Sequence, residues 1–167
     1  MNGKQTTATS DELRYKIDAK NATVGIVGMG YVGLPLAVAV FNTGFNVIGF
    51  DVDPHKISCL ESGDPYLSHF GDHFLKTLAD STRFVATSSP TDLKNADIII
   101  LCVPTPLDLN KEPDLSYVLN STKEIAKILR RGQMVILEST TYPGTTRDEV
   151  LPLLERGAFH REWFPDT

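Results

Sequence analysis

The feature that most constrains this chain is a glycine-rich segment placed between an apolar run and an apolar helix pattern. Residues 23–27 (TVGIV) form a short β-branched run, GMGYVG follows at residues 28–33, and helical periodicity begins directly afterwards. The pattern GxGxxG is weak evidence alone, because glycine is common. Directly after a strand and at the start of a helix, however, it predicts a turn that binds the phosphates of a dinucleotide.

Each glycine of this segment has a separate physical role in such a turn. Gly28 would permit the tight bend after the strand, and Gly30 would let the backbone approach a pyrophosphate with no Cβ in the way. Gly33 would let the helix pack closely against the strand. The first N–H groups of the helix have no partner within the helix, so they would face the anionic phosphates.

An acidic residue after the second apolar run completes the pattern. Asp51 directly follows residues 45–50, where a carboxylate accepts hydrogen bonds from both hydroxyls of the adenosine ribose. Its charge repels a 2′-phosphate, which favours NAD over NADP as the cofactor. Asp53 competes for this role, but Asp51 is preferred because it comes straight after the strand. Lys56 either reaches the adenosine ribose or a phosphate, or lies on the solvated face of a helix; its position alone leaves both interpretations open.

Strand and helix patterns alternate from residue 23 onward, which is typical of βαβ units in an α/β protein. Right-handed crossovers then predict a Rossmann-type, doubly wound parallel sheet of five strands in the order 3-2-1-4-5, flanked by helices. The most apolar strand, residues 96–103, is expected at the centre of the sheet, and residues 83–86 at an edge. The expected strands are 23–27, 45–50, 83–86, 96–103 and 133–137, and the expected helices are 34–42, 56–61, 65–79, 115–129 and 145–154.

The two ends of the chain differ from this alternating part. Residues 1–9 are polar and are expected to be disordered, and Ser10 is expected to cap a short helix. The chain therefore divides into a polar tail with a short helix (1–22), a dinucleotide-binding domain (23–156) and an atypical carboxyl-terminal tail (157–167).

Composition disfavours several kinds of partner. The net charge of −5 argues against nucleic acid and anionic membranes, which need clustered Lys and Arg. No apolar run is long enough to cross a bilayer and the start has no signal-peptide core, so a cytoplasmic location is expected. Cys59 and Cys102 form no CxxC pair and are interpreted as reduced, packed thiols. The histidines have no consistent partner spacing, so no metal site is expected at His55, His69, His73 or His160.

Four longer segments carry a family resemblance. VGIVGMGYVGLPLA, GFDVDPHKI, ADIIILCVPTPLD and VILESTTYPGTT occur in this order and at fitting spacing. Together they resemble the UDP-glucose/GDP-mannose dehydrogenase family from about residue 23 to residue 154. The segment ESTTYPGT is similar to the branch that acts on UDP-N-acetylhexosamines, especially the UDP-N-acetylglucosamine 6-dehydrogenases, because the UDP-glucose branch usually carries lysine at the position of Glu138.

This resemblance implies a reaction and a set of residue roles. Members of the family oxidise the C6 alcohol of a nucleotide sugar to a carboxylate in two hydride transfers that use two NAD. By the same resemblance, Tyr31 and Val32 contact the pyrophosphate or the nicotinamide ribose, and Asp51 and Lys56 contact the adenosine ribose. The proline-flanked Thr105, after the fourth strand, contacts the cofactor as well.

The resemblance also supplies the candidate catalytic residue. Thr140, after the fifth strand, is implied to lie near the nicotinamide and to position the reacting alcohol or water. For Thr105 and Thr140 the alternative is a hydroxyl that only satisfies a loose backbone group at a strand end. Glu138 is either a functional carboxylate or merely a polar strand end.

Several segments that the family uses for catalysis and dimerisation have no match in this sequence. The family continues with a sixth strand, a Ser-Pro-Glu segment, a dimerising helix and a domain with the catalytic Lys, Asn and Cys, whereas residues 157–167 read as none of these. We therefore expect a polypeptide that binds NAD but does not oxidise a UDP-sugar by itself, since its substrate site is incomplete. A missing sixth strand would leave a sheet edge exposed, which favours a homo-oligomer.

Two other interpretations stay open. A relative of 6-phosphogluconate or hydroxyacyl dehydrogenases would share the Rossmann opening, but the PTP and ESTTYPGT segments count against it. A catalytically dead NAD-binding module, acting as a sensor or scaffold, would fit the missing chemistry. An adjacent reading frame with a GxCxPKD-like segment would favour a split enzyme over such a module.

Overall fold

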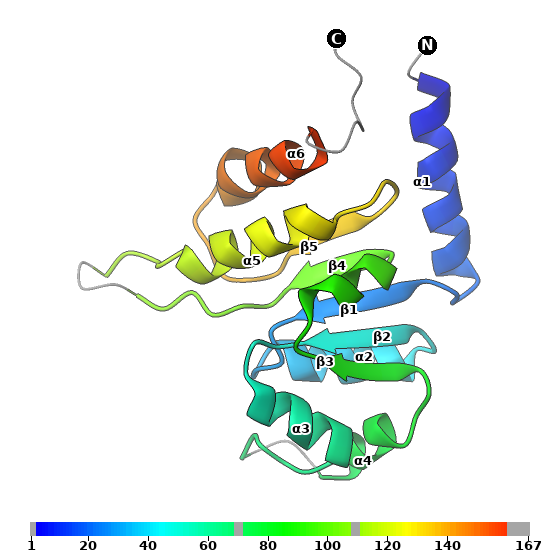
Figure 1. Cartoon of the computed structure of the whole chain (residues 1–167), viewed down its shortest axis with the longest axis vertical. Helices are drawn as coiled ribbons and strands as arrows, with labels where there is room; N and C mark the ends of the chain where they lie inside the picture. Colours follow the sequence, from blue (N-terminus) through cyan, green and yellow to red (C-terminus); the bar gives the residue numbers. More distant parts are fainter. Residues whose placement is uncertain (1–2, 69–71, 108–110, 160–167) are drawn as a thin grey trace.

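Five parallel strands form one sheet through the middle of the molecule (Figure 1). The computed structural model describes residues 3–68, 72–107 and 111–159. The strand order is β3-β2-β1-β4-β5, which confirms the predicted Rossmann-type topology. The strands are β1 (Thr23–Val27), β2 (Asn46–Phe50), β3 (Phe84–Thr87), β4 (Ile98–Leu101) and β5 (Met134–Leu137).

Helices cover both faces of this sheet. The helical segments of the described residues are α1 (Gly3–Asp18), α2 (Gly33–Asn42), α3 (Pro54–Ser62), α4 (Asp72–Ala79), the 3-10 helix η1 (Pro90–Asn95), α5 (Ser116–Ile128), the π-helical turn η2 (Thr146–Val150) and α6 (Leu151–Phe159). The helices α2, α3 and α4 pack on one face, whereas η1, α5 and α6 pack on the other. In the described part of the chain, no helix has the length and apolar character that crossing a bilayer requires.

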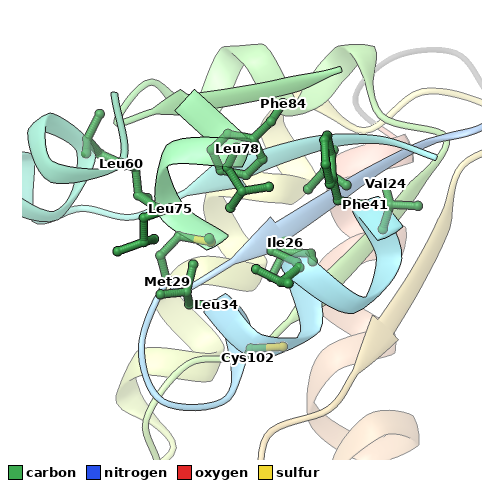
Figure 2. Close-up of a cluster of buried hydrophobic side chains, with 14 residues drawn as sticks. Val24, Ile26, Met29, Leu34, Phe41, Leu60, Leu75, Leu78, Phe84 and Cys102 are labelled. Carbon is green, nitrogen blue, oxygen red and sulfur yellow. The ribbon is translucent and has the colours of Figure 1, made fainter. Parts of the chain in front are cut away.

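Side chains alternate along the strands and so build two separate cores. In β1, Val24 and Ile26 belong to the core under α2, whereas Val27 joins the opposite core. Figure 2 shows the first core, where Phe41 of α2 and Leu78 of α4 lie with the strand residues. Burying a side chain of this size contributes about 1.5–3 kcal/mol, so both faces of the sheet stabilise the fold.

Two predicted elements differ in extent or position. The helix predicted over residues 65–79 is present only as α4, because the segment before it leaves the helical path so that Tyr66 reaches the glycine turn, and this tertiary contact outweighs local periodicity. The strand predicted over residues 96–103 is the shorter β4, and it lies between β1 and β5. The central position belongs to β1, since the crossovers run outward from it in both directions. The expected edge position of residues 83–86 is confirmed by β3.

The last helix extends past residue 157, where the sequence predicts that the atypical carboxyl-terminal tail begins. It starts as η2 and continues as α6 to Phe159. Pro152 has no N–H to donate and its ring crowds the carbonyl one turn earlier, so a wider turn before it relieves the clash. A Cβ on Gly157 would lie 2.6 Å from the Cβ of Ala126, which shows how closely α6 approaches α5.

The amino-terminal helix is longer than expected. It begins at Gly3, so residues 3–9 are helical rather than disordered, and Ser10 lies inside the helix instead of capping it. Near its other end, the Nζ of Lys16 lies 2.9 Å from the carboxylate of Asp97. This contact holds the carboxyl-terminal turns of α1 in place. Each residue added toward the amino terminus then gains one hydrogen bond without a new nucleation cost, so the helix extends through the polar residues at its start.

Asp97 joins distant parts of the chain at the amino-terminal end of β4. Its side chain accepts hydrogen bonds from the N–H of Thr23 at 3.0 Å, from Lys16 at 2.9 Å and from Arg130 at 2.8 Å. The residue is 6% exposed. Burial would raise the pKa of this carboxyl, but the backbone hydrogen bond and the two cations outweigh burial and hold the pKa of Asp97 below its ordinary value.

Replacing Asp97 by Asn should lower the free energy of unfolding by about 2 kcal/mol at neutral pH, because two partly buried cations lose their counter-ion. A lowered folded-state pKa means that the contribution is complete above the unfolded pKa of about 3.9 and is lost as the pH falls through the folded value. Urea unfolding at pH 7 and at low pH measures both effects. The exposed Asp18→Asn is the control, and equal losses in the two variants would contradict the assignment.

Candidate dinucleotide-binding site

The carboxyl ends of the strands border a cavity of about 580 Å³. Its walls are the ends of β1, β2 and β4, the loop after β3, and α5. This edge contains the point where the strand order reverses, which is where doubly wound sheets bind their ligands. The lining includes apolar residues at the strand ends (Val27, Phe50 and Val103), Leu93 of η1, and polar residues on α5 (Asn120, Ser121, Lys123 and Glu124).

The glycine turn has the geometry that its sequence predicts. Gly28 has a φ of 94°, and a Cβ there would lie 2.7 Å from the carbonyl oxygen of Cys102. A Cβ on Gly33 would overlap the carbonyl oxygen of Gly28. A Cβ on Gly30, by contrast, would have no atom within 4 Å. The fold itself therefore requires Gly28 and Gly33, whereas the space over Gly30 is open to a ligand.

Asp51 is a buried carboxylate beside this turn. It is 5% exposed, follows β2 directly and lines the cavity. Its Oδ2 accepts a 2.8 Å hydrogen bond from the N–H of Met29, and its Oδ1 accepts a 3.0 Å hydrogen bond from the N–H of Asp53. The carboxylate thus links the end of β2 to the turn after β1, at the wall of the cavity.

The two candidate aspartates have different surroundings. Asp53 is the N-cap of α3 and accepts a 2.9 Å hydrogen bond from the N–H of His55, although it also borders the cavity. Lys56 extends from α3 to Asp51, with 2.9 Å between Nζ and Oδ2, and its side chain is 29% exposed. Lys56 therefore lies at the cavity rather than on a fully solvated helix face.

Backbone donors are free where α2 begins. Val32 precedes the helix, and no side chain caps it. Among the hydrogen bonds of the described residues, none is donated by the N–H of Gly30, Tyr31 or Val32. The side chains of Tyr31 and Val32 are 72% and 56% exposed. Free N–H groups at the positive end of a helix suit a phosphate.

The two candidate threonines lie beyond the ends of β4 and β5, outside the lining of the cavity. Thr105 is half-buried and Thr140 is exposed. Ser139 donates a 2.8 Å hydrogen bond to the carbonyl oxygen of Val103 and so ties these two strand ends together. The structure therefore separates the candidate residues into a group near β1 and β2 and a group beyond β4 and β5.

Comparison with known proteins agrees with this geometry. The sequence pattern of the UDP-glucose/GDP-mannose dehydrogenase family, NAD binding domain, matches residues 22–162. This chain belongs to that family. It is 39% identical to Protein CapL of Staphylococcus aureus and 38% identical to UDP-N-acetyl-D-glucosamine 6-dehydrogenase of Pseudomonas aeruginosa. These alignments cover 81% and 82% of this chain, but 31% and 32% of the two relatives.

Solved structures of the family lead to the same conclusion. A ternary complex of GDP-mannose dehydrogenase from Pseudomonas aeruginosa superimposes with a TM-score of 0.77 at 30% identity, covering 81% of this chain and 32% of that one. The UDP-D-ManNAc dehydrogenase of Pyrococcus horikoshii gives a TM-score of 0.74 at 34% identity, covering 84% of this chain and 34% of that one. The chain thus spans about a third of the length of these relatives and contains the NAD-binding domain of the UDP-glucose/GDP-mannose dehydrogenase family.

Sequence reasoning does not find the part of this NAD-binding domain's site that α5 supplies. Tyr117, Asn120 and Ser121 border the cavity. Periodicity shows that a helix has a polar face, but tertiary packing decides what that face meets. Tyr66 is also missed: its hydroxyl donates a 2.8 Å hydrogen bond to the carbonyl oxygen of Met29. No sequence motif marks this contact, because the two residues belong to different loops.

Neither cysteine of the NAD-binding domain lines the cavity. Cys102 is 7% exposed, and burial together with the nearby Glu138 carboxylate raises the pKa of its thiol to about 11. Cys59 lies on α3, with its Sγ 3.9 Å from Nε2 of His55. Within the described ranges no three His, Cys, Asp or Glu side chains are grouped as metal ligands, and His69 and His160 lie outside those ranges.

Two alanine substitutions in the glycine turn should differ strongly in their effect on stability. Gly33→Ala should lower the free energy of unfolding by about 3 kcal/mol, because its Cβ meets the backbone of Gly28, which has little room to move. Gly30→Ala should change it by less than about 0.5 kcal/mol, since its Cβ meets no protein atom. Urea unfolding followed by circular dichroism compares them. A similar loss in both variants would show that the turn is packed differently.

Proposed function

We propose that this chain binds NAD, with the adenosine half in the cavity and the pyrophosphate over the glycine turn. The observation that carries this proposal is the position of Asp51, a buried carboxylate at the cavity wall and in contact with the turn. A carboxylate at this place in a Rossmann fold accepts hydrogen bonds from ribose hydroxyls. The family's description as an NAD binding domain supports the same cofactor.

The residues present fit such a cofactor. The cavity of about 580 Å³ lies within the usual range of small-molecule sites, about 300–1,000 Å³. The open space over Gly30 admits a phosphate, and the free N–H groups of Gly30, Tyr31 and Val32 are its donors. Asp51 repels a 2′-phosphate, so NAD is preferred to NADP. Lys56, which already reaches Asp51, contributes to holding the adenosine ribose.

The nicotinamide half is assigned to the ends of β4 and β5. There Thr105 contacts the cofactor, and Thr140 positions the reacting alcohol or water and is the candidate catalytic residue. Tyr31 and Val32, exposed on the turn, contact the pyrophosphate or the nicotinamide ribose. The hydrogen bond from Ser139, which joins the two strand ends, supports their acting together.

The proposed reaction to which this domain contributes is that of a nucleotide-sugar 6-dehydrogenase. Relatives of this chain are named UDP-N-acetyl-D-glucosamine 6-dehydrogenase and UDP-N-acetyl-D-mannosamine dehydrogenase. On this proposal the chain supplies the cofactor domain for oxidising the C6 alcohol of a UDP-N-acetylhexosamine or UDP-hexose to a carboxylate. Bound NAD is the hydride acceptor of that chemistry. Cys102 is buried and its thiol stays protonated, and Cys59 lies on α3 beside His55, so neither thiol is suited to act as a nucleophile and we propose that the chain alone is inactive.

Calorimetric titration tests the cofactor assignment. Wild-type protein should bind NAD more tightly than NADP, and Asp51→Ala should weaken NAD binding by about 1–3 kcal/mol, because hydrogen bonds to a charged acceptor are lost. Asp53→Ala is the matched control, since it removes a neighbouring carboxylate whose hydrogen bond caps α3. If only the Asp53 variant loses affinity, Asp51 is not the carboxylate that binds the ribose. If wild-type protein shows no detectable NAD binding, the proposal that NAD is the cofactor is refuted.

An activity assay tests the proposed inactivity of the chain alone. With NAD and UDP-N-acetylglucosamine, the chain alone should form no NADH above background, because the Cys102 thiol is buried and protonated and Cys59 lies away on α3. The UDP-N-acetyl-D-glucosamine 6-dehydrogenase of Pseudomonas aeruginosa is the positive control. Turnover by this chain would contradict the proposed inactivity and would exclude a purely scaffolding role.

A further inference from the structure

Met29, the residue between the first two glycines of the turn, is held at both of its peptide groups. Its N–H donates a 2.8 Å hydrogen bond to Asp51, and its carbonyl oxygen accepts a 2.8 Å hydrogen bond from the hydroxyl of Tyr66. The side chain of Met29 is fully buried beside Leu34 and Leu75 (Figure 2). Neither peptide plane next to Met29 is therefore free to rotate.

The hydrogen bond from Tyr66 fixes the peptide that joins Met29 to Gly30. A planar trans peptide directs its C=O and its N–H to opposite sides, and the described chain contains no cis peptide bond. With the Met29 carbonyl held toward Tyr66, the N–H of Gly30 points the other way. That N–H donates to no group among the described residues, and a Cβ on Gly30 would face open space.

Tyr66 is suited to hold this carbonyl. It is half-buried in the segment between α3 and α4, so it approaches the turn from outside the strand–turn–helix unit. Burial, together with the negative charge of Asp51, raises the pKa of the Tyr66 phenol above its ordinary value, so the hydroxyl remains a donor at neutral pH. Tyr66 does not border the cavity itself.

We propose that Tyr66 is a positioning residue that directs the N–H of Gly30 toward the pyrophosphate of the bound dinucleotide. This inference rests on the proposed NAD function and adds a residue to it. Because Tyr66 acts through one peptide group, its effect is confined to ligands that carry phosphate over the turn. The ribose hydroxyls are held by Asp51, which keeps its own hydrogen bonds when the tyrosine hydroxyl is removed.

The test compares Tyr66→Phe with wild-type protein on two ligands. Tyr66→Phe keeps the ring and removes only the hydroxyl. Its Kd for NAD should rise about tenfold, whereas its Kd for adenosine, which has the ribose hydroxyls but no phosphate, should change less than about twofold. Tyr15→Phe, the same change at a 71% exposed tyrosine on α1, should leave both constants unchanged. Calorimetry measures NAD, and NMR titration measures adenosine.

Each outcome has a distinct meaning. If wild-type protein does not bind NAD, the proposed function fails and this inference falls with it. If wild-type protein binds NAD and Tyr66→Phe binds it equally well, only the positioning role is overturned. Equal weakening of NAD and adenosine would also overturn it, because a general loss of structure predicts that result.

A second measurement needs no variant. In wild-type protein, saturation with NAD should shift the backbone amide resonance of Gly30, whereas adenosine should leave that resonance in place. An unshifted Gly30 amide in the NAD complex would overturn the proposal even if Tyr66→Phe does not fold.

Discussion

The close approach of α2 to the glycine turn is the constraint on which the carboxyl edge of the sheet depends. A side chain at Gly33 would overlap the Gly28 carbonyl, and a side chain at Gly28 would press on the carbonyl of Cys102 where the chain leaves β4. Three segments therefore meet here through bare backbone. Their contact places the start of α2, with its free donors, beside the end of β2 and its buried carboxylate.

Much of this arrangement was predictable because it is local in sequence. Parallel strands that are buried on both faces appear as apolar runs, so β1 and β2 were predicted almost to the residue. The glycines and Asp51 follow these strands directly, and the geometry of the turn depends on neighbours within one strand–turn–helix unit. The helix predicted over residues 65–79 was too long at its start, because apolar periodicity does not reveal that Tyr66 leaves the helical path to contact Met29.

The features that sequence reasoning missed are those that join distant segments. No sequence motif marks Asp97, and its partners come from α1, β1 and the segment after α5. Tyr66 and the cavity wall of α5 are similar cases. Their roles depend on which loops and helices pack together, which no local pattern records. The roles of Thr105 and Thr140 rest on family resemblance, since neither threonine lines the cavity.

Two nearly buried aspartates stand at opposite ends of this parallel sheet. Asp51 follows the carboxyl end of β2, whereas Asp97 precedes the amino end of β4. One carboxylate faces a cavity, and the other is enclosed by cations and backbone that belong to the fold. Changes at separate sites with no shared partners add in free energy. The sheet can therefore evolve a new ligand preference at one rim while keeping its resistance to unfolding at the other.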